Sequence, residues 1–193
     1  MSSLHLVAGL GNPGPEYDRT RHNFGFLTVD ELAERLGAGK FKRSRKHSAL
    51  VAEARDGDDR LVLAKPQTFM NLSGRSMASL MSFFKVPLGS VIVVHDELDL
   101  PFGIVRVKLG GGTAGHNGLR SIVPAIGSDF VRVRIGIGRP TGRKDPVDFV
   151  LDAFTKSEAP EVPAIVDRAA DAVLSVVHEG VGAAQTEFNR REE

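Results

Sequence analysis

The stretch Val91-Ile92-Val93-Val94-His95-Asp96-Glu97 decides the fold class of this chain. Its first four residues are apolar and β-branched, a run that is typical of a strand buried on both faces of a sheet. Polar and titratable side chains follow at once, where this strand ends. In an open α/β sheet, the loops at the carboxyl ends of the strands meet in one crevice, where ligands bind. The stretch therefore predicts an α/β sheet and places Asp96 at its ligand-binding edge.

Strand-like and helix-like patterns alternate on both sides of this stretch. Short β-compatible runs occupy residues 4–10, 48–54, 60–64, 104–109 and 131–137. Helical patterns occupy residues 24–36, 73–84, 117–126, 145–154, 158–178 and 183–191. The turn-forming residues 56–59 predict a hairpin between two of the strands. We expect one α/β domain over residues 1–193, with a twisted, mixed, mostly parallel sheet and helices on both faces.

The composition excludes several chemistries. The chain has 193 residues, of which 41% are hydrophobic, and a formal net charge of +1. It has no cysteine, so disulfides, thiolate metal sites and a cysteine nucleophile are excluded. The first residues lack the basic and apolar regions of a secretory signal, and no apolar run approaches the ~20 residues of a membrane span. We expect a cytoplasmic protein that does not associate with a membrane.

Polar loops follow several of the predicted strands and contain the candidate catalytic residues. His22 precedes the first predicted helix, and Asp96 ends the most apolar strand. A histidine titrates ordinarily at about pH 6.5, so it can act as a base near neutral pH, and a carboxylate can hold it in one tautomer. His95 points to the opposite face of an extended strand from Asp96, which makes it a weaker candidate. Because no serine lies in an elbow motif, we expect a hydrolase that activates water.

Amides and aromatic rings accompany these residues in the same loops. Three asparagines lie in separate loops near glycines: Asn12, Asn71 and Asn117. Each could shape a turn, but the set is better explained if it also binds a carbonyl or hydroxyl group of a ligand. His116 is either a further site residue or the start of a helix. Tyr17, the only tyrosine, and Phe69 could provide an aromatic surface for a base or ribose, although Phe69 could instead pack in the core.

Two alternating runs and one basic run carry much of the positive charge. In residues 104–109 and 131–137, basic residues alternate with Val and Ile, which predicts one buried face and one positive face. Lys108 and Arg134 lie on the positive face. The run at residues 40–46 contains Lys40, Lys42, Arg43, Arg45 and Lys46. Such a run is usually a set of solvated charges, and a functional role requires its residues to share one surface.

Two other site types are disfavoured by spacing. His22, Asp96, Asp99 and His116 could ligate a metal, but their spacing matches no metal motif such as H-E-x-x-H, and we expect no metal. Residues 9–14 match the dinucleotide pattern G-x-G-x-x-G. However, Pro13 removes one amide donor, and no strand ends in an acidic residue about 20 positions later. A nicotinamide oxidoreductase therefore remains only a weak alternative.

Six segments, in order and over nearly the whole chain, resemble those of the bacterial-type peptidyl-tRNA hydrolases. They are residues 7–17 (VAGLGNPGPEY), 20–26 (TRHNFGF), 65–74 (KPQTFMNLSG), 95–101 (HDELDLP), 110–112 with 115–120 (GGG and GHNGLR) and 132–140 (RVRIGIGRP). The resemblance implies a monomeric enzyme without a cofactor that cleaves the ester between a peptide and tRNA. Its implied partners are the acceptor stem and 3′ end of peptidyl-tRNA, and ribosomal subunits that carry stalled peptidyl-tRNA. The rival is an RNA-binding domain without catalysis.

The resemblance also implies roles for individual residues. His22 corresponds to the catalytic base, Asp96 to its partner, and Asn12 to the asparagine that senses an acylated α-amino group. The other implied substrate or tRNA contacts are Tyr17, Phe69, Asn71, His116 and Asn117, with Lys108 and Arg134 at tRNA phosphates. The basic run at residues 40–46 has no strict counterpart in the family. Ala114 stands where many relatives have glycine, which concerns the flexibility of a loop and not the catalytic set.

Overall fold

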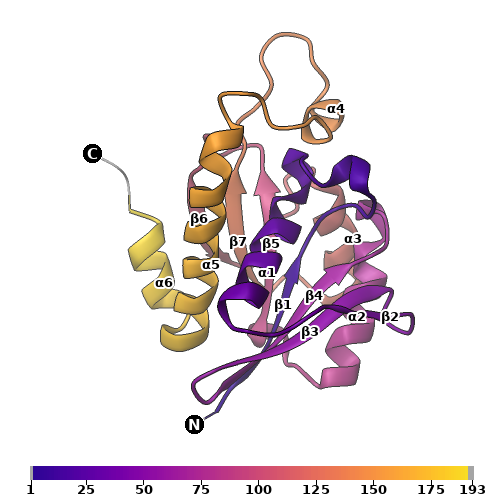
Figure 1. Ribbon diagram of the computed structural model, residues 1–193, viewed down its shortest axis with the longest axis vertical. Helices are drawn as coiled ribbons and strands as arrows, with labels where there is room; N and C mark the ends of the chain where they lie inside the picture. Colours follow the sequence, from indigo (N-terminus) through magenta and orange to yellow (C-terminus); the bar gives the residue numbers. More distant parts are fainter. Residues whose placement is uncertain (1, 191–193) are drawn as a thin grey trace.

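A seven-stranded mixed sheet forms the centre of this computed structural model, which describes residues 2–190 (Figure 1). Its strands follow the order β2-β3-β4-β1-β5-β7-β6. The central pairings of β1 with β4 and β5, and of β5 with β7, are parallel, whereas the outer pairings are antiparallel. The strands are β1 Leu4–Gly9, β2 Lys42–Ser44, β3 Ala49–Asp56, β4 Asp59–Pro66, β5 Val91–Glu97, β6 Val105–Leu109 and β7 Val131–Gly136. The predicted α/β fold with a mixed sheet is confirmed, and the parallel pairings, expected over most of the sheet, lie at its centre.

Helices cover both faces of this sheet, as predicted (Figure 1). On one face lie α1 (Phe24–Arg35), α5 (Val162–Glu179) and α6 (Val181–Phe188). The other face is covered by α2 (Ser73–Phe84) and α3 (Asn117–Ile126). The short helix α4 (Pro146–Val150) lies beyond the carboxyl ends of the parallel strands. None of the helices in residues 2–190 has the length and apolar character that a membrane crossing requires.

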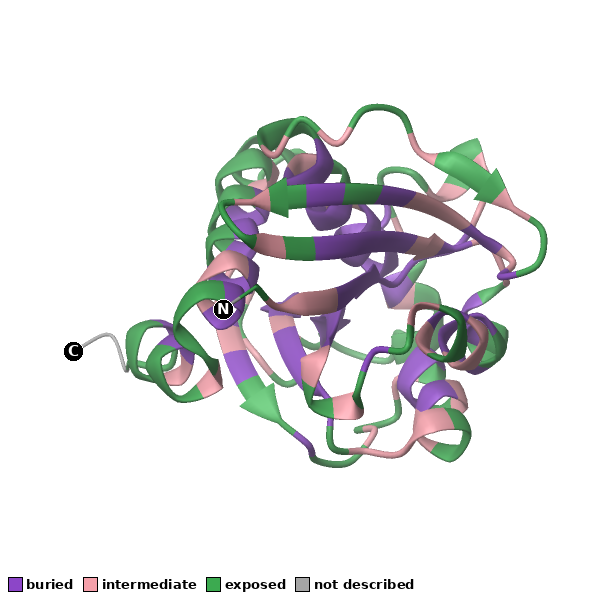
Figure 2. Ribbon diagram, turned by 90° about the horizontal axis from the view of Figure 1, so that it is seen from below, coloured by how far each residue is buried: buried purple, intermediate pink, exposed green. Residues whose placement is uncertain are grey.

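Strand β5 is buried along its whole length, as its apolar run predicts. Ile92 and Val94 pack in the core beneath α1 and α5, whereas Val91 and Val93 pack in the core beneath α2 and α3. This alternation follows from the two-residue period of a strand. Buried residues accordingly follow the central strands and the helix faces turned toward them (Figure 2). The rigid centre of the sheet thus fixes the position of Asp96 at the end of β5.

Two glycines bring helix α1 against the backbone of the central strands. A Cβ atom on Gly9 would lie 2.1 Å from the carbonyl oxygen of Gly25, and one on Gly25 would lie 2.3 Å from the carbonyl oxygen of Val94. Any side chain at either position would push the helix away from the sheet. The contact holds the start of α1, and the 3-10 turn Arg21–Asn23 before it, close to the end of β5. The first glycine of the G-x-G-x-x-G pattern therefore serves helix packing.

Several predicted boundaries differ from the structure. The helix expected over residues 145–154 begins as predicted, with Asp145 as its N-cap, but ends at Val150 because Ala153 bridges to Thr20. A 3-10 turn occupies residues 159–161, so α5 begins at Val162. The last helix ends at Phe188, and position 191 of the expected helix lies outside the described residues. Strand β2 was not predicted, because three charged or polar residues carry no apolar alternation.

Candidate active site

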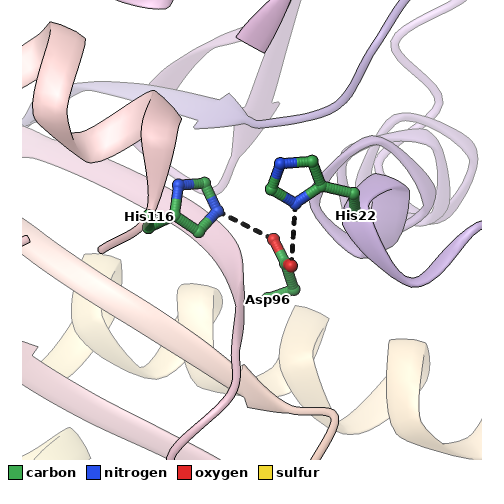
Figure 3. Close-up of side chains that lie close together, drawn as sticks. All are labelled: His22, Asp96 and His116. Atoms are coloured by element: carbon green, nitrogen blue, oxygen red, sulfur yellow. Dashed lines mark hydrogen bonds and ion pairs between the residues drawn. The ribbon is translucent and has the colours of Figure 1, made fainter. Parts of the chain in front are cut away.

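One buried carboxylate joins two histidines at the carboxyl end of β5 (Figure 3). The Oδ2 atom of Asp96 lies 2.8 Å from Nδ1 of His22, and its Oδ1 atom lies 2.8 Å from Nε2 of His116. The residues come from the 3-10 turn before α1, the end of β5 and the residue that precedes α3. Asp96 is 2% exposed and His22 is 5% exposed. The predicted contact between His22 and Asp96 is therefore present, and His116 completes a three-residue cluster.

Hydrogen bonds define which nitrogen of each ring carries a proton. The Nδ1 atom of His116 accepts from the backbone N–H groups of Gly118 and Leu119, at 3.1 and 3.4 Å, so the proton lies on Nε2 and is donated to Asp96. His22 meets the other carboxylate oxygen with Nδ1, which must also donate, because a carboxylate only accepts. Among the described residues, none donates a hydrogen bond to the Nε2 lone pair of His22. His116 thus starts α3 as its N-cap, one of the two roles considered for it, and also contacts Asp96.

The cluster keeps its carboxylate charged despite burial. Burial opposes ionisation of Asp96, but the electrostatic interactions with His22 and His116 and the hydrogen bonds that both rings donate outweigh it and hold the pKa of the carboxyl well below its ordinary value. Burial lowers the pKa of the neighbouring His95 to about 3, so that ring stays neutral. His95 donates from Nδ1 to the backbone carbonyl of Asp96, and the centre of its ring lies 5.0 Å from the ring centre of His116. A neutral His95 therefore supports the cluster without adding charge.

Asn12 is held so that its amide hydrogens face open space. Its Oδ1 atom accepts from the backbone N–H of Met70 at 2.9 Å. Its backbone N–H donates to Oδ1 of Asn23 at 2.8 Å, and Nδ2 of Asn23 donates back to its carbonyl at 3.0 Å. Within the described residues, the Nδ2 group of Asn12 makes no hydrogen bond, and the residue lines a cavity. Asn12 therefore presents N–H donors, which suit the carbonyl oxygen of a ligand.

Most of the predicted ligand-binding residues line this cavity. It measures about 400 Å³ and is lined by Asn12, Tyr17, His22, Phe69, Met70, Asn71, Asn117, Val147, Val150 and Leu151. A second cavity, of about 60 Å³, adjoins it at His22 and Asn117 and reaches Asp96 and His116. Phe69 is 57% exposed, so the alternative that it packs in the core is wrong. Amides, an aromatic surface and the free side of His22 thus face one volume.

Two groups of residues that support this cavity were not predicted from the sequence. Arg21 is buried and donates to the carbonyl oxygen of Phe149 and to Oε1 of Glu158, at 3.1 and 2.7 Å, which fixes the turn that carries His22. The apolar wall from α4 was missed as well, although its helix start was recognised. The helical spacing of Val147, Val150 and Leu151 was the available signal.

Lys108 and Arg134 lie outside that cavity. They line a separate cavity of about 90 Å³ with His95, Glu97, Gly112, Ala114, Leu119 and Arg132. Arg134 pairs with Glu97 at 3.0 Å, whereas Lys108 has no ion pair within residues 2–190. Arg132 was expected on the same positive face, but it is buried and donates to the carbonyl oxygens of Gly111 and Gly112. The loop at residues 110–112 therefore covers Arg132 on the face of the strands that was predicted to be positive and exposed.

The residues considered for a metal are only partly brought together. One ligand atom from each of His22, Asp96 and His116 lies within 4.8 Å of the others. Both histidine nitrogens that face Asp96 carry donated protons, and a metal would have to replace both hydrogen bonds. Asp99, the fourth residue of the set, instead pairs with Arg139 at 2.6 Å. The donor set therefore fits a hydrogen-bonded base better than a metal centre.

Comparison with known proteins settles the family. A family model described as Peptidyl-tRNA hydrolase matches residues 6–193. The chain belongs to the peptidyl-tRNA hydrolase family. It is 57% identical over 185 residues to the peptidyl-tRNA hydrolase of Nocardia farcinica, which covers 95% of each chain. It is 56% identical over 186 residues to that of Mycobacterium tuberculosis, which covers 96% of this chain and 97% of the relative.

The fold of this chain also matches solved structures of this family. The crystal structure of peptidyl-tRNA hydrolase from Acinetobacter baumannii superposes with a TM-score of 0.91 at 37% identity, and the match covers 98% of this chain and 96% of that one. A 5′-methylthioadenosine nucleosidase from Arabidopsis thaliana, at a TM-score of 0.51 and 9% identity, shares the fold alone. The predicted family and its activity, hydrolysis of peptidyl-tRNA, are confirmed. The rival interpretation, an RNA-binding domain without catalysis, is therefore wrong.

Proposed function

We propose that His22 activates the water that hydrolyses peptidyl-tRNA and that Asp96 fixes and stabilises the histidine. One observation carries this proposal: Nδ1 of His22 is hydrogen-bonded to Asp96 at 2.8 Å, while its Nε2 has no hydrogen-bond partner within residues 2–190 and the ring lines the cavity. A base needs a lone pair directed at the water, and a buried carboxylate favours the imidazolium that forms when the proton is taken. The second hydrogen bond, from His116, keeps the carboxylate in the orientation that His22 requires.

The reaction requires one proton transfer in each direction. Nε2 of His22 takes a proton from water as the water oxygen attacks the ester carbonyl. The Nδ2 group of Asn12 and the amide of Asn117 line the same volume and supply N–H donors for the oxygens of the tetrahedral intermediate or the peptide backbone. When the intermediate collapses, the C–O bond to the tRNA ribose breaks and the imidazolium returns its proton to the leaving oxygen. Peptide acid and tRNA are released.

The cavity accounts for selection of the blocked substrate without reading peptide sequence. Asn71 and Asn117 position the peptide backbone, and Tyr17 and Phe69 contact the 3′-terminal ribose and base. The Nδ2 group of Asn12 donates to the carbonyl that exists only when the α-amino group is acylated. Val147 and its neighbours in α4 provide an apolar wall that tolerates any peptide side chain.

The rest of the substrate extends beyond this cavity. Lys108 and Arg134 contact phosphates of the acceptor stem, and the 3′ end enters the cavity at Phe69. We further propose that residues 1–193 act as a single domain and a monomer in the cytoplasm, on peptidyl-tRNA released from or stalled on ribosomal subunits. No cofactor is required, because the water is activated by a side chain.

Substitution of His22 tests this function. In His22→Ala, kcat for an N-acetylaminoacyl-tRNA should fall by about 10²–10⁴, the usual contribution of a general base. His5→Gln is the matched control, because His5 lies in β1 near Asp59, at the opposite end of the sheet. The control should hydrolyse at the parent rate. Turnover by His22→Ala at the parent rate, with the fold intact, would contradict the proposal.

A further inference from the structure

The basic run at residues 40–46 forms an exposed cationic edge of the molecule. All five of its cations are exposed: Lys40, Lys42, Arg43, Arg45 and Lys46. None of the five forms an ion pair within residues 2–190, whereas Lys65 and Arg60 on the neighbouring hairpin both pair with carboxylates. Lys42 and Arg43 lie in β2, which has a partner on one side only. The positive charge of this edge is therefore uncompensated by the protein.

This edge continues into the loop that carries ligand-binding residues. The backbone N–H of Gln67 donates to the carbonyl of Ser48 at 2.7 Å, and Ala49 pairs with Pro66 at the end of β4. Phe69 follows two residues after Gln67 and Asn71 follows four after, and both line the active-site cavity. The chain therefore connects the cationic edge to the cavity through one short segment.

Helix α2 extends the same surface along one of its faces. His47 and Ser79 are joined by a 2.7 Å hydrogen bond, and the ammonium of Lys46 lies 4.6 Å from the ring centre of Phe83. Ser79 and Phe83 are four residues apart, so they share a helix face with Arg75, one turn nearer the active site. Arg75 is exposed and has no ion pair in the described part of the chain. The β2 surface consists of Lys40, Lys42, Arg43, Arg45, Lys46 and Arg75.

We propose that the β2 surface binds phosphates of the RNA body of the substrate, beyond the 3′ end; this assignment rests on the proposed placement of that 3′ end in the cavity. The substrate is a polyanion, and neutralisation of phosphates by Lys and Arg supplies most of the affinity that does not depend on sequence. Charges on an edge strand also prevent pairing with other chains, but that role requires neither the extension to Arg75 nor continuity with the site.

This surface is separate from the Lys108 and Arg134 cavity. Strand β2 forms one edge of the sheet, and β6, which carries Lys108, forms the other. The active site lies between them, at the ends of β1 and β5. RNA that contacts both edges would be held on each side of the scissile ester. Loss of the phosphate contacts at one edge of the sheet should therefore weaken RNA binding while the contacts at the other edge remain.

The test measures binding of deacylated, full-length tRNA by fluorescence anisotropy over a range of salt concentrations. In Lys42→Ala/Arg43→Ala, loss of two phosphate contacts should reduce the slope of log K against log salt by roughly 1.4–1.8. The dissociation constant should rise by about 25- to 60-fold at ~0.1 M salt, an effect that disappears toward ~1 M. Lys42→Arg/Arg43→Lys retains both charges and should bind as the parent does.

Arg55→Ala/Arg60→Ala is the matched control. Both residues are exposed and lie directly opposite each other on β3 and β4, near the hairpin turn, and their loss changes the net charge equally. The control should keep the parent slope. Equal weakening in both double variants would reduce the effect to net charge and overturn the proposal, as would an unchanged slope in Lys42→Ala/Arg43→Ala.

A second substrate separates this proposal from the catalytic one. An N-acetylaminoacyl ester of the CCA trinucleotide lacks the RNA body, so Lys42→Ala/Arg43→Ala should hydrolyse it with the parent kcat and KM. If the parent enzyme cleaved neither the tRNA ester nor the short ester, the catalytic proposal would be contradicted. The comparison of tRNA binding would still show whether the β2 surface binds RNA. Slower cleavage of the short ester by the double variant would show that the basic run acts on the part of the substrate inside the cavity. That result would overturn the proposal that the run binds the RNA body.

Discussion

Replacement of Asp96 by asparagine separates the charge of this residue from its shape. Each oxygen of Asp96 accepts a hydrogen bond from a protonated histidine nitrogen, at a donor–acceptor distance of 2.8 Å. An asparagine fits the same space but offers one acceptor and one NH₂ donor. One histidine must then face a donor. His116 cannot change tautomer without losing its bonds to the N–H groups of Gly118 and Leu119. His22 is therefore the ring that rearranges.

The expected loss combines two effects. Hydrogen bonds to charged groups contribute about 1.5–3 kcal/mol, and loss of that contribution at the imidazolium corresponds to about 10- to 150-fold in rate. If His22 accepts at Nδ1 from the new NH₂ group, its proton moves to Nε2 and the lone pair that attacks water is lost. Such a tautomer change raises the total loss toward ~10⁴. We expect kcat for Asp96→Asn to fall by about 10²–10⁴.

The assay is single-turnover hydrolysis of N-acetylaminoacyl-tRNA, which avoids control by product release. Circular dichroism and thermal unfolding verify the fold of the variant. His116→Asn provides a comparison, because it removes the other bond to Asp96 and leaves the bond to His22. It should cost less than Asp96→Asn. A rate for folded Asp96→Asn within about threefold of the parent would refute the reasoning, since 1.5 kcal/mol already corresponds to about tenfold.

Two further predictions concern selectivity and pH. Asn12→Asp should reduce the ratio of kcat/KM for N-blocked aminoacyl-tRNA to kcat/KM for free aminoacyl-tRNA. One carboxylate oxygen would still accept from the N–H of Met70, while the second oxygen would repel the carbonyl of the blocked substrate and attract the ammonium of the free one. An unchanged ratio would remove Asn12 from this role. The hydrogen bond from His178 to Asp56 raises the pKa of His178, so its stabilisation is complete below about pH 6.5 and is lost as the pH rises through the raised value. His178→Ala should therefore lower Tm more at about pH 5.5 than at about pH 8.5, by an amount that corresponds to about 0.2–1 kcal/mol for an exposed pair; a pH-independent difference would contradict this.

Local patterns predicted most of the secondary structure because they depend on near neighbours. The apolar period of α2 gave both of its ends, and the β-branched run gave β5 with its burial on both faces. The failures occurred where tertiary contacts decide the outcome. Helix α4 ends early because Ala153 pairs with a residue more than a hundred positions away. Arg132 is buried because a loop folds over its face, which alternation along one strand cannot reveal.

The candidate site shows the same division. Loops at strand ends were predicted to meet, and six of the predicted residues do line one cavity. The contact between His22 and Asp96 was inferred from residue types and from the resemblance, since 74 positions separate them. The bridging role of Asp96 could not be predicted, because it depends on the placement of α3 relative to β5. Nor could the orientation of the Nδ2 group of Asn12 be predicted, because it depends on the hydrogen bond that Oδ1 accepts from Met70.

The order of the strands explains why the site lies between β1 and β5. After β1 the chain passes through α1 and continues to β2, β3 and β4, on one side of β1. After β5 it continues to β6 and β7, on the other side. Loops that leave two neighbouring parallel strands in opposite directions open a crevice between them. Asn12 follows β1 and Asp96 ends β5, so each wall of the crevice receives polar groups from a different connection. The loop after β1 then returns across the crevice to start α1, and this return carries His22 to Asp96.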